Sequence, residues 1–219
     1  KGRLATPLLI ITACQLADIT SATDTAFWTP YEPDENTFLL LHFDNQQQPN
    51  EKGRFGGGHS GERSWIQPTS ELFLSANVSL ECWVKLDRIP TERAYLIRRK
   101  PKEGATRGFE LFVEPSGHFG IAVQNVRGKR YELKSSRNRV PVKRWTHLGG
   151  ISNSRSFQTL YINGHEVARE ALSNHMGLVP ASAREETIPS PVTIAEGIHG
   201  VVHEVRIHTN INKPFFLII

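Results

Sequence analysis

The chain consists of short apolar segments separated by turn residues, and this pattern limits the folds that it can adopt. From residue 37 onward no stretch of ten or more residues keeps the helical period of 3.6, so we expect little helix. Strands are expected at residues 38–43, 78–86, 109–114, 118–124, 157–162, 165–168, 192–195 and 201–208. Roughly a dozen strands at this spacing are too many for one open sheet. The sequence therefore predicts an all-β chain folded as an antiparallel sandwich of two packed sheets.

Turn signals and chain length favour a single domain. Asn163 and Gly164 separate two expected strands, and a type I′ turn needs positive φ at two successive residues, which Asn-Gly supplies at little cost. Pro-Ser-Gly at 115–117 reads as a second hairpin loop. With 219 residues, 38% of them hydrophobic, the chain can bury one substantial core. No internal repeat or low-complexity linker divides the sequence.

The first 22 residues have the order of a secretory leader. Lys1 and Arg3 precede an apolar run at 4–13 that ends at Cys14. Ile-Thr-Ala-Cys at 11–14 resembles a bacterial lipobox, in which the cysteine is lipidated; a plain signal peptide and an unrelated apolar start are the alternatives. At ~1.5 Å per residue the run is too short to span a bilayer. We expect a secreted protein or a cell-surface, outer-membrane lipoprotein, with membrane anchoring through lipidated Cys14.

The second cysteine, Cys82, lies in a segment that alternates between apolar and polar residues. Leu80, Cys82 and Val84 share one face of this expected strand, so Cys82 should point into the core. We expect a buried free thiol. Trp83 lies on the opposite face with Glu81 and Lys85, where it could line a binding surface. Burial in the core is the alternative for Trp83.

Six segments carry a resemblance to a known family. In chain order they are Leu-Leu-Leu-His-Phe-Asp at 39–44, Gly-Arg-Phe-Gly-Gly at 53–57, Val-Ser-Leu-Glu-Cys-Trp-Val-Lys at 78–85, Trp-Thr-His-Leu-Gly-Gly at 145–150, Leu-Tyr-Ile-Asn-Gly at 160–164 and Gly-Val-Val-His-Glu-Val-Arg-Ile at 200–207. Their order resembles the laminin-G-like jelly-roll family within the concanavalin-A-like lectin and glucanase superfamily. The resemblance implies a two-sheet jelly-roll sandwich over residues 35–210, followed by an unassigned tail at 211–219.

The resemblance also bears on metal binding. Relatives often hold a structural calcium near the first and last strands, with an aspartate of the closing strand among its ligands. Asp44 is present in the opening strand, but His203 stands where that closing aspartate is expected. Calcium prefers several oxygen ligands, so a histidine weakens the site. We expect no cofactor and at most a weakened structural calcium site at Asp44.

Catalytic motifs are missing from the sequence. Glycosidases of this fold use paired carboxylates in a Glu-x-Asp-x-x-Glu strand, and no such run occurs. A Glu four residues before a Lys, as at 81 and 85, is usually a solvated pair. His199 and His203 would lie about 13 Å apart on a strand, too far for one metal ion. There is no Gly-x-Ser-x-Gly elbow and no phosphate-binding Gly-Lys-Ser/Thr loop, so we do not expect an enzyme.

The basic residues are unevenly distributed. One stretch has Glu132 as its single acid and contains Arg127, Lys129, Arg130, Lys134, Arg137, Arg139, Lys143 and Arg144. A second cluster contains Arg98, Arg99, Lys100 and Lys102. Such clusters suit anionic polymers, and for an exported protein an anionic glycan is favoured over nucleic acid, which we do not expect as a partner. A solvated basic face is the alternative.

These observations lead to one functional hypothesis with two alternatives. The resemblance implies a non-catalytic module that binds carbohydrate, including anionic glycan, or a partner on a cell surface. A structural or adhesion module that binds protein is the alternative, and a glycoside-active enzyme comes third. The candidate ligand-binding residues are Trp83, Glu81, Lys85, Arg98, Arg127, Lys129 and Arg130.

Overall fold

The computed structural model describes residues 77–100, 108–124, 128–153, 156–172 and 191–208, together with the backbone of three short strands at 9–11, 37–41 and 64–66. These residues form thirteen strands and no helix. The strands are β1 (Leu9–Ile11), β2 (Thr37–Leu41), β3 (Ser64–Ile66), β4 (Asn77–Leu86), β5 (Ala94–Arg99), β6 (Gly108–Val113), β7 (His118–Gln124), β8 (Arg130–Arg139), β9 (Trp145–Asn153), β10 (Phe157–Ile162), β11 (His165–Ala171), β12 (Val192–Glu196) and β13 (Gly200–His208). The predicted all-β class is confirmed.

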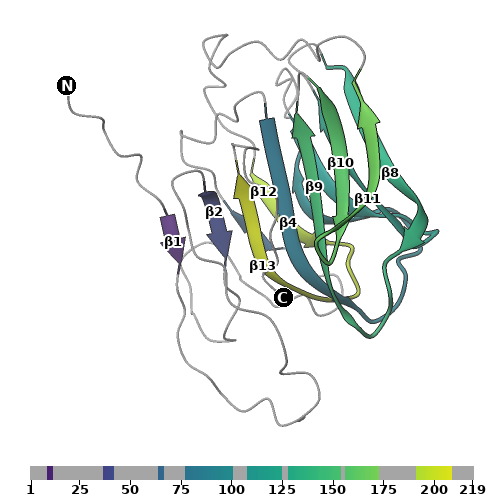
Figure 1. Ribbon diagram of the computed structural model, residues 1–219. Coiled ribbons are helices and arrows are strands. Elements are labelled where there is room, and N and C mark those ends of the chain that lie inside the picture. Colours follow the sequence, from purple (N-terminus) through teal and green to yellow (C-terminus); the bar gives the residue numbers. More distant parts are fainter. Residues whose placement is uncertain are drawn as a thin grey trace.

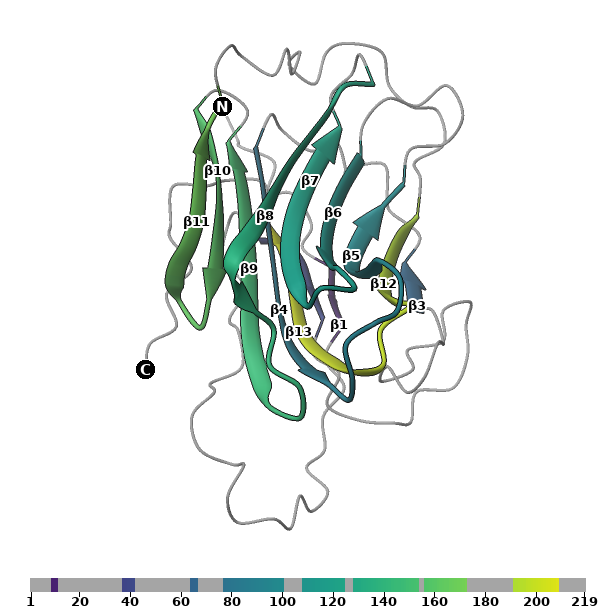
Figure 2. The ribbon, with the colours of Figure 1, turned by 90° about the vertical axis from the view of Figure 1, so that its right-hand side faces the viewer.

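The strands form two sheets that stack as the layers of a sandwich (Figures 1 and 2). The seven-stranded sheet has the order β1-β2-β13-β4-β9-β10-β11, and the six-stranded sheet has the order β3-β12-β5-β6-β7-β8. Neighbouring strands are antiparallel apart from the parallel pair β1 and β2. The closing strand β13 lies between β2 and β4, so both ends of the jelly roll meet in one sheet.

Alternation along the strands builds the core between the sheets. On β4 the side chains of Leu80, Cys82 and Val84 are fully buried, while Trp83 on the other face is half-buried. The β6 residues Phe109, Leu111 and Val113 and the β7 residues Phe119, Ile121 and Val123 face the same core. Each large apolar side chain buried in this way contributes roughly 1.5–3 kcal/mol. Cys82 is a buried free cysteine, as predicted.

The predicted turn at Asn163 and Gly164 is confirmed. Their φ angles are 47° and 77°, as a type I′ turn requires. The turn is also tied to β9, because the backbone N–H of His147 donates to Asn163 Oδ1 at 2.9 Å and the Asn163 N–H donates to the His147 carbonyl at 2.9 Å. The asparagine therefore both permits the turn and fixes it against β9.

Close packing at Gly120 fixes the position of Phe112 on the outer face of the six-stranded sheet. The Phe112 ring lies over Gly120 of β7, and a Cβ at this glycine would come within 2.5 Å of Phe112 Cζ and 2.6 Å of the Leu133 carbonyl oxygen. Only glycine fits at this position.

Some sequence predictions concern residues outside the described part. Cys14, Asp44, Arg127 and the tail at 211–219 lie there, as does most of the expected leader. The strand β1 falls within the predicted leader segment and pairs with β2. In the portions of the chain that the structure describes, we find no helix with the length and hydropathy of a membrane span.

Candidate functional site

The outer face of the seven-stranded sheet brings together aromatic, histidine and charged side chains. In the strand register, Trp83 of β4 lies between His203 of β13 and His147 of β9. One row away Lys85 pairs with Trp145, and on the other side Glu81 lies opposite Arg206. We call this surface the Trp83 face, and it comprises Glu81, Trp83, Lys85, Trp145, His147, His203 and Arg206.

Two tryptophans on this face pack against histidines and are only half-buried. The rings of Trp83 and His147 are 5.5 Å apart at an interplanar angle of 56°. The rings of Trp145 and His203 are 6.3 Å apart in an edge-to-face arrangement at 81°. Both indoles and the Lys85 side chain keep part of their surface exposed. Fixed aromatic surface is therefore available next to polar groups.

Beside Trp83, the carboxylate of Glu81 is buried and fully engaged. Its side chain and that of His147 are each 1% exposed. Glu81 Oε2 lies 3.1 Å from His147 Nε2, and Glu81 Oε1 accepts hydrogen bonds from the Arg206 guanidinium. A buried charge needs such partners. The expected solvated pair of Glu81 with Lys85 is wrong, because the strand register places Glu81 against Arg206 in the sheet.

A β-bulge explains how His203 and Arg206 reach the same face. In a regular strand, residues three apart point to opposite faces of the sheet. The register shifts between His203 and Arg206, and the intervening Glu204 is buried with a left-handed φ of 47°. The His203 ring contacts its carboxylate, with Nδ1 3.4 Å from Glu204 Oε1. Period-2 reasoning from the sequence cannot find this arrangement, since it assumes a regular strand.

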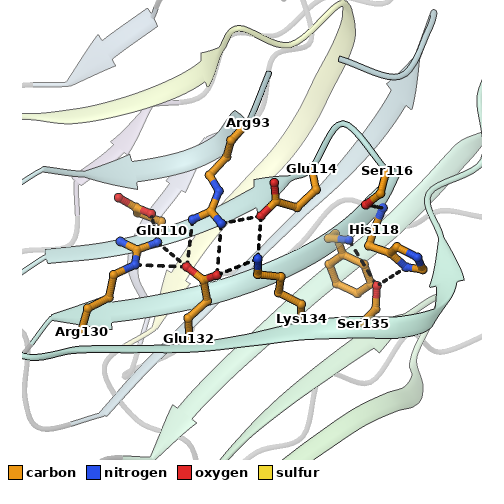
Figure 3. Close-up of polar contacts among 10 residues, drawn as sticks. Arg93, Glu110, Glu114, Ser116, His118, Arg130, Glu132, Lys134 and Ser135 are labelled. Atoms are coloured by element: carbon orange, nitrogen blue, oxygen red, sulfur yellow. Dashed lines mark hydrogen bonds and ion pairs between the residues drawn. The ribbon is translucent and has the colours of Figure 1, made fainter. Parts of the chain in front are cut away.

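The outer face of the six-stranded sheet carries a different cluster, in which acids and bases alternate (Figure 3). We call it the charge ladder, and its members are Arg93, Arg98, Glu110, Glu114, Arg130, Glu132, Lys134 and Glu196. The ion pairs that join them are at 2.6 to 3.5 Å, apart from the shorter contact between Arg93 and Glu114. The ladder holds four cations and four carboxylates, so the ladder itself is neutral.

Glu132 is the centre of the ladder. It accepts hydrogen bonds from Arg93 at 2.8 and 3.1 Å and from Arg130 at 2.7 and 3.1 Å, and it forms an ion pair with Lys134 at 3.1 Å. Burial raises the pKa of Glu132, but these hydrogen bonds outweigh burial and lower the pKa to about 2. For Arg93, burial lowers the pKa, while hydrogen bonds to Glu132 and Glu114 raise it above its ordinary value.

Aromatic rings lie beneath two arginines of the ladder. The Arg93 guanidinium carbon lies 4.0 Å from the Phe112 ring centroid, and that of Arg98 lies 3.9 Å from the Tyr95 centroid. These cations are held by both carboxylates and rings. The ladder is therefore a stabilising surface layer over Phe112.

The predicted ligand-binding residues are divided between the two outer faces. Trp83, Glu81 and Lys85 lie together on the Trp83 face. Arg98 and Arg130 belong to the charge ladder, where Glu110, Glu132 and Glu196 pair with them. Lys129 lies 5.0 Å from the Tyr131 ring centroid, and Arg127 is outside the described residues. The basic stretch itself contains a single acid. Its other acidic partners, Glu110 and Glu114, come from β6 and the residue that follows it, so the sequence of the stretch does not reveal them.

The described residues contain no group of three or more histidine, cysteine or acidic side chains that could hold a metal ion. His203, the residue expected in place of a calcium-binding aspartate, packs against Trp145 and Glu204. Asp44 is not among the described residues, so the predicted calcium site stays a prediction.

Comparison with known proteins identifies the family. A family model described as the concanavalin A-like lectin/glucanases superfamily, of laminin-G type, matches residues 60–211. The chain belongs to this family. The resemblance seen in the sequence motifs is thereby confirmed, together with the jelly-roll sandwich. No curated protein sequence matches the chain.

Several solved structures resemble this chain in fold, although their sequence identity to it is low. The carbohydrate-binding module CBM40 of the Ruminococcus gnavus IT-sialidase, bound to α2,3-sialyllactose, has a TM-score of 0.54 and 14% identity, over 74% of this chain and 93% of that module. The receptor-binding domain of botulinum neurotoxin D has a TM-score of 0.51 and 16% identity, over 80% of this chain and 45% of that domain. The binding domain of Paraclostridial Mosquitocidal Protein 1 has a TM-score of 0.51 and 14% identity, over 69% of this chain and 38% of that domain. The chain thus spans less than half of these toxin domains, and identities this low show the fold alone.

Proposed function

We propose that the chain is a non-catalytic module that binds carbohydrate through the Trp83 face. The observation that carries this proposal is the pair of half-exposed indoles, Trp83 and Trp145, which are held by histidines above a buried charged group. A flat ring offers a stacking surface for the apolar face of a sugar, and Lys85 and His203 supply polar groups at its edge. Few side chains need to be ordered on binding, because the rings are already packed.

The engagement of Glu81 supports binding over catalysis. Glycoside hydrolysis needs one carboxyl group that donates a proton and a second that attacks or activates water. On the Trp83 face both oxygens of Glu81 are engaged by His147 and Arg206. The buried contact of Glu81 with His147 therefore holds in place the histidine against which Trp83 packs.

The fold relatives support a recognition role in the same way. One solved relative is a carbohydrate-binding module with a sialylated sugar bound, and others are receptor-binding or binding domains of toxins. A glycan or receptor at a cell surface fits secretion or surface display of this chain, with lipidation of Cys14 as the anchor. A protein partner in adhesion is the alternative reading of the same fold.

A glycan array run at two salt concentrations tests the proposal. The wild-type protein should bind a defined set of glycans, and Trp83→Ala should lose that signal. Tyr95→Ala is the matched control, since Tyr95 is also a half-buried aromatic residue but lies on the opposite outer face. Unchanged binding by Trp83→Ala would contradict the proposal. If the wild-type protein binds no glycan but still captures a cell-surface protein, the adhesion alternative would be favoured.

A further inference from the structure

The basic stretch that ends at Arg144 falls into two halves with different electrostatic surroundings. In the first half, Arg130 and Lys134 belong to the charge ladder and are neutralised by Glu110, Glu114 and Glu132. Further along, three exposed arginines make no ion pair with any residue that the structure describes: Arg137, Arg139 and Arg144. Among the described residues, acids neutralise the cations of the first half, whereas these three arginines of the second half have no acidic partner.

A bulge in β8, held by hydrogen bonds of Ser135, separates the two halves. Gly120 of β7 pairs with Lys134 of β8, and His118 pairs with Arg139. Two residues of β7 therefore lie opposite five residues of β8, so β8 holds three additional residues. The buried Ser135 hydroxyl donates to the Asn138 carbonyl at 2.7 Å and accepts from the Phe119 N–H at 3.2 Å. Figure 3 shows Ser135 beside His118, whose Nδ1 lies 3.5 Å from the hydroxyl. Bulges of edge strands redirect side chains. This one is held by a buried hydroxyl, and it displays Arg137 at the edge of the sheet.

The backbone beyond the bulge is fixed to two neighbouring elements, the turn between β6 and β7 and the end of β4. The Val140 N–H donates to the Gly117 carbonyl at 2.8 Å, and the Lys143 N–H donates to the Leu86 carbonyl at 2.6 Å. Val142 also bridges to Leu86. The Lys143 ammonium pairs with Asp87 at 3.1 Å, but both side chains are largely exposed, so this pair is weak. The side chains of this stretch therefore project from a rigid support.

We propose that Arg137, Arg139, Lys143 and Arg144 form a second binding site, the basic edge, for a linear anionic glycan that carries sulfate or carboxylate groups. The four cations lie within eight residues, from the end of β8 to the bend at 143–144, where Lys143 has a left-handed φ of 61°. Four cations distributed over a strand end and a bend match a polymer with repeated charges better than a single small anion. Three of the four are arginines, which bind sulfate and carboxylate in a bidentate manner.

The same stretch argues against a lipid surface as the ligand. Val142, at 42% exposure, is the one exposed large hydrophobic side chain among the described residues. A single aliphatic side chain offers little area for insertion between lipids, and membrane-surface segments usually present several large apolar residues. The basic edge shares no residue with the Trp83 face, although Arg144 directly precedes Trp145 of that face, and separate variants at Trp83 and at the arginines distinguish the two sites.

Binding of size-defined heparin oligosaccharides, which carry sulfate and uronate groups, tests the basic edge. Affinity is measured by titration calorimetry at two salt concentrations for the wild type and for the triple variant Arg137→Gln, Arg139→Gln, Arg144→Gln. We expect at least a tenfold loss of affinity and a weaker salt dependence in the variant. The control is Lys100→Gln, Arg169→Gln, which removes two positive charges from other exposed positions, and we expect less than a threefold loss.

Two further variants sharpen the test. The triple arginine-to-lysine variant at the same positions keeps the charge and should lose a part of the affinity, because lysine cannot form the bidentate contact. Trp83→Ala should bind the oligosaccharides normally. Equal losses in the two glutamine variants, or no binding by the wild type, would overturn the proposal. Binding to phosphatidylserine vesicles through the basic edge without binding to the oligosaccharides would overturn it in favour of a lipid surface.

Discussion

Replacement of Glu132 by glutamine should destabilise the protein in a way that depends on pH. Glu132 holds three cations of the charge ladder at 2.7 to 3.1 Å, and 22% of its side chain is exposed. Its pKa of about 2 in the fold, against an ordinary 4.5, corresponds to ~3 kcal/mol of favourable interaction. Partial solvent screening reduces this figure, so we expect a loss of about 1–2 kcal/mol at pH 7.

The direction of the pH dependence follows from the lowered pKa. A carboxyl group with a lower pKa in the folded state than in the unfolded state contributes stability above its unfolded value of 4.5. This contribution is lost as the pH falls through the window between 4.5 and about 2, because the proton binds the unfolded chain more readily. The penalty of Glu132→Gln should therefore be full at pH 7 and nearly absent at pH 2.

Urea unfolding of the wild type and the variant across this pH range measures the effect. In a thermal melt at pH 7 the same loss of unfolding free energy should lower Tm by about 2–8 °C for a domain of this size. The control is Glu166→Gln, since Glu166 and Arg169 form an exposed pair at 3.5 Å with side chains 43% and 51% exposed, and its loss should stay below ~0.5 kcal/mol. An equal loss in both variants, or a Glu132→Gln penalty that persists at pH 2, would refute the reasoning.

Three further outcomes are expected. Cys82 should resist thiol reagents under native conditions, because burial, with a smaller effect of Glu81, raises the pKa of its thiol; rapid labelling would contradict this. Gly120→Ala should lower stability by about 2 kcal/mol or more in chemical unfolding, because its Cβ would meet the Phe112 ring and a backbone carbonyl; a neutral substitution would contradict that packing. Millimolar calcium should raise Tm little in the wild type, and more in His203→Asp if only the closing carboxylate is missing; a large rise in the wild type would contradict the weakened site.

The fold could be predicted because its determinants are local. The alternation of Leu80, Cys82 and Val84 with polar residues defines the buried face of β4, and Asn163 with Gly164 defines a hairpin. These signals depend on neighbours in the sequence alone. The family resemblance then implied the two-sheet jelly roll, which local periodicity does not give, but the order of the strands within each sheet was not predicted.

The sites were less predictable because they depend on register between distant strands. Glu81 and Arg206 are 125 residues apart, and the bulge at Glu204 decides that they face each other. Similarly, Glu110 neutralises Arg130 only because β6, β7 and β8 are neighbours in the sheet. A sequence shows which charges exist, but it does not show which strands bring them together.

Nuclear magnetic resonance titration with a glycan selected on the array tests the Trp83 face most directly. The indole Nε1–H signal of Trp83, assigned with Trp83→Phe, is followed together with the backbone amides of β4, β9 and β13 and with those of the charge ladder. The account predicts saturable shifts of the Trp83 indole and of amides around His147 and His203, while the amides of Glu110 and Glu132 stay unchanged. Shifts confined to the six-stranded sheet, with an unchanged Trp83 indole, would contradict it.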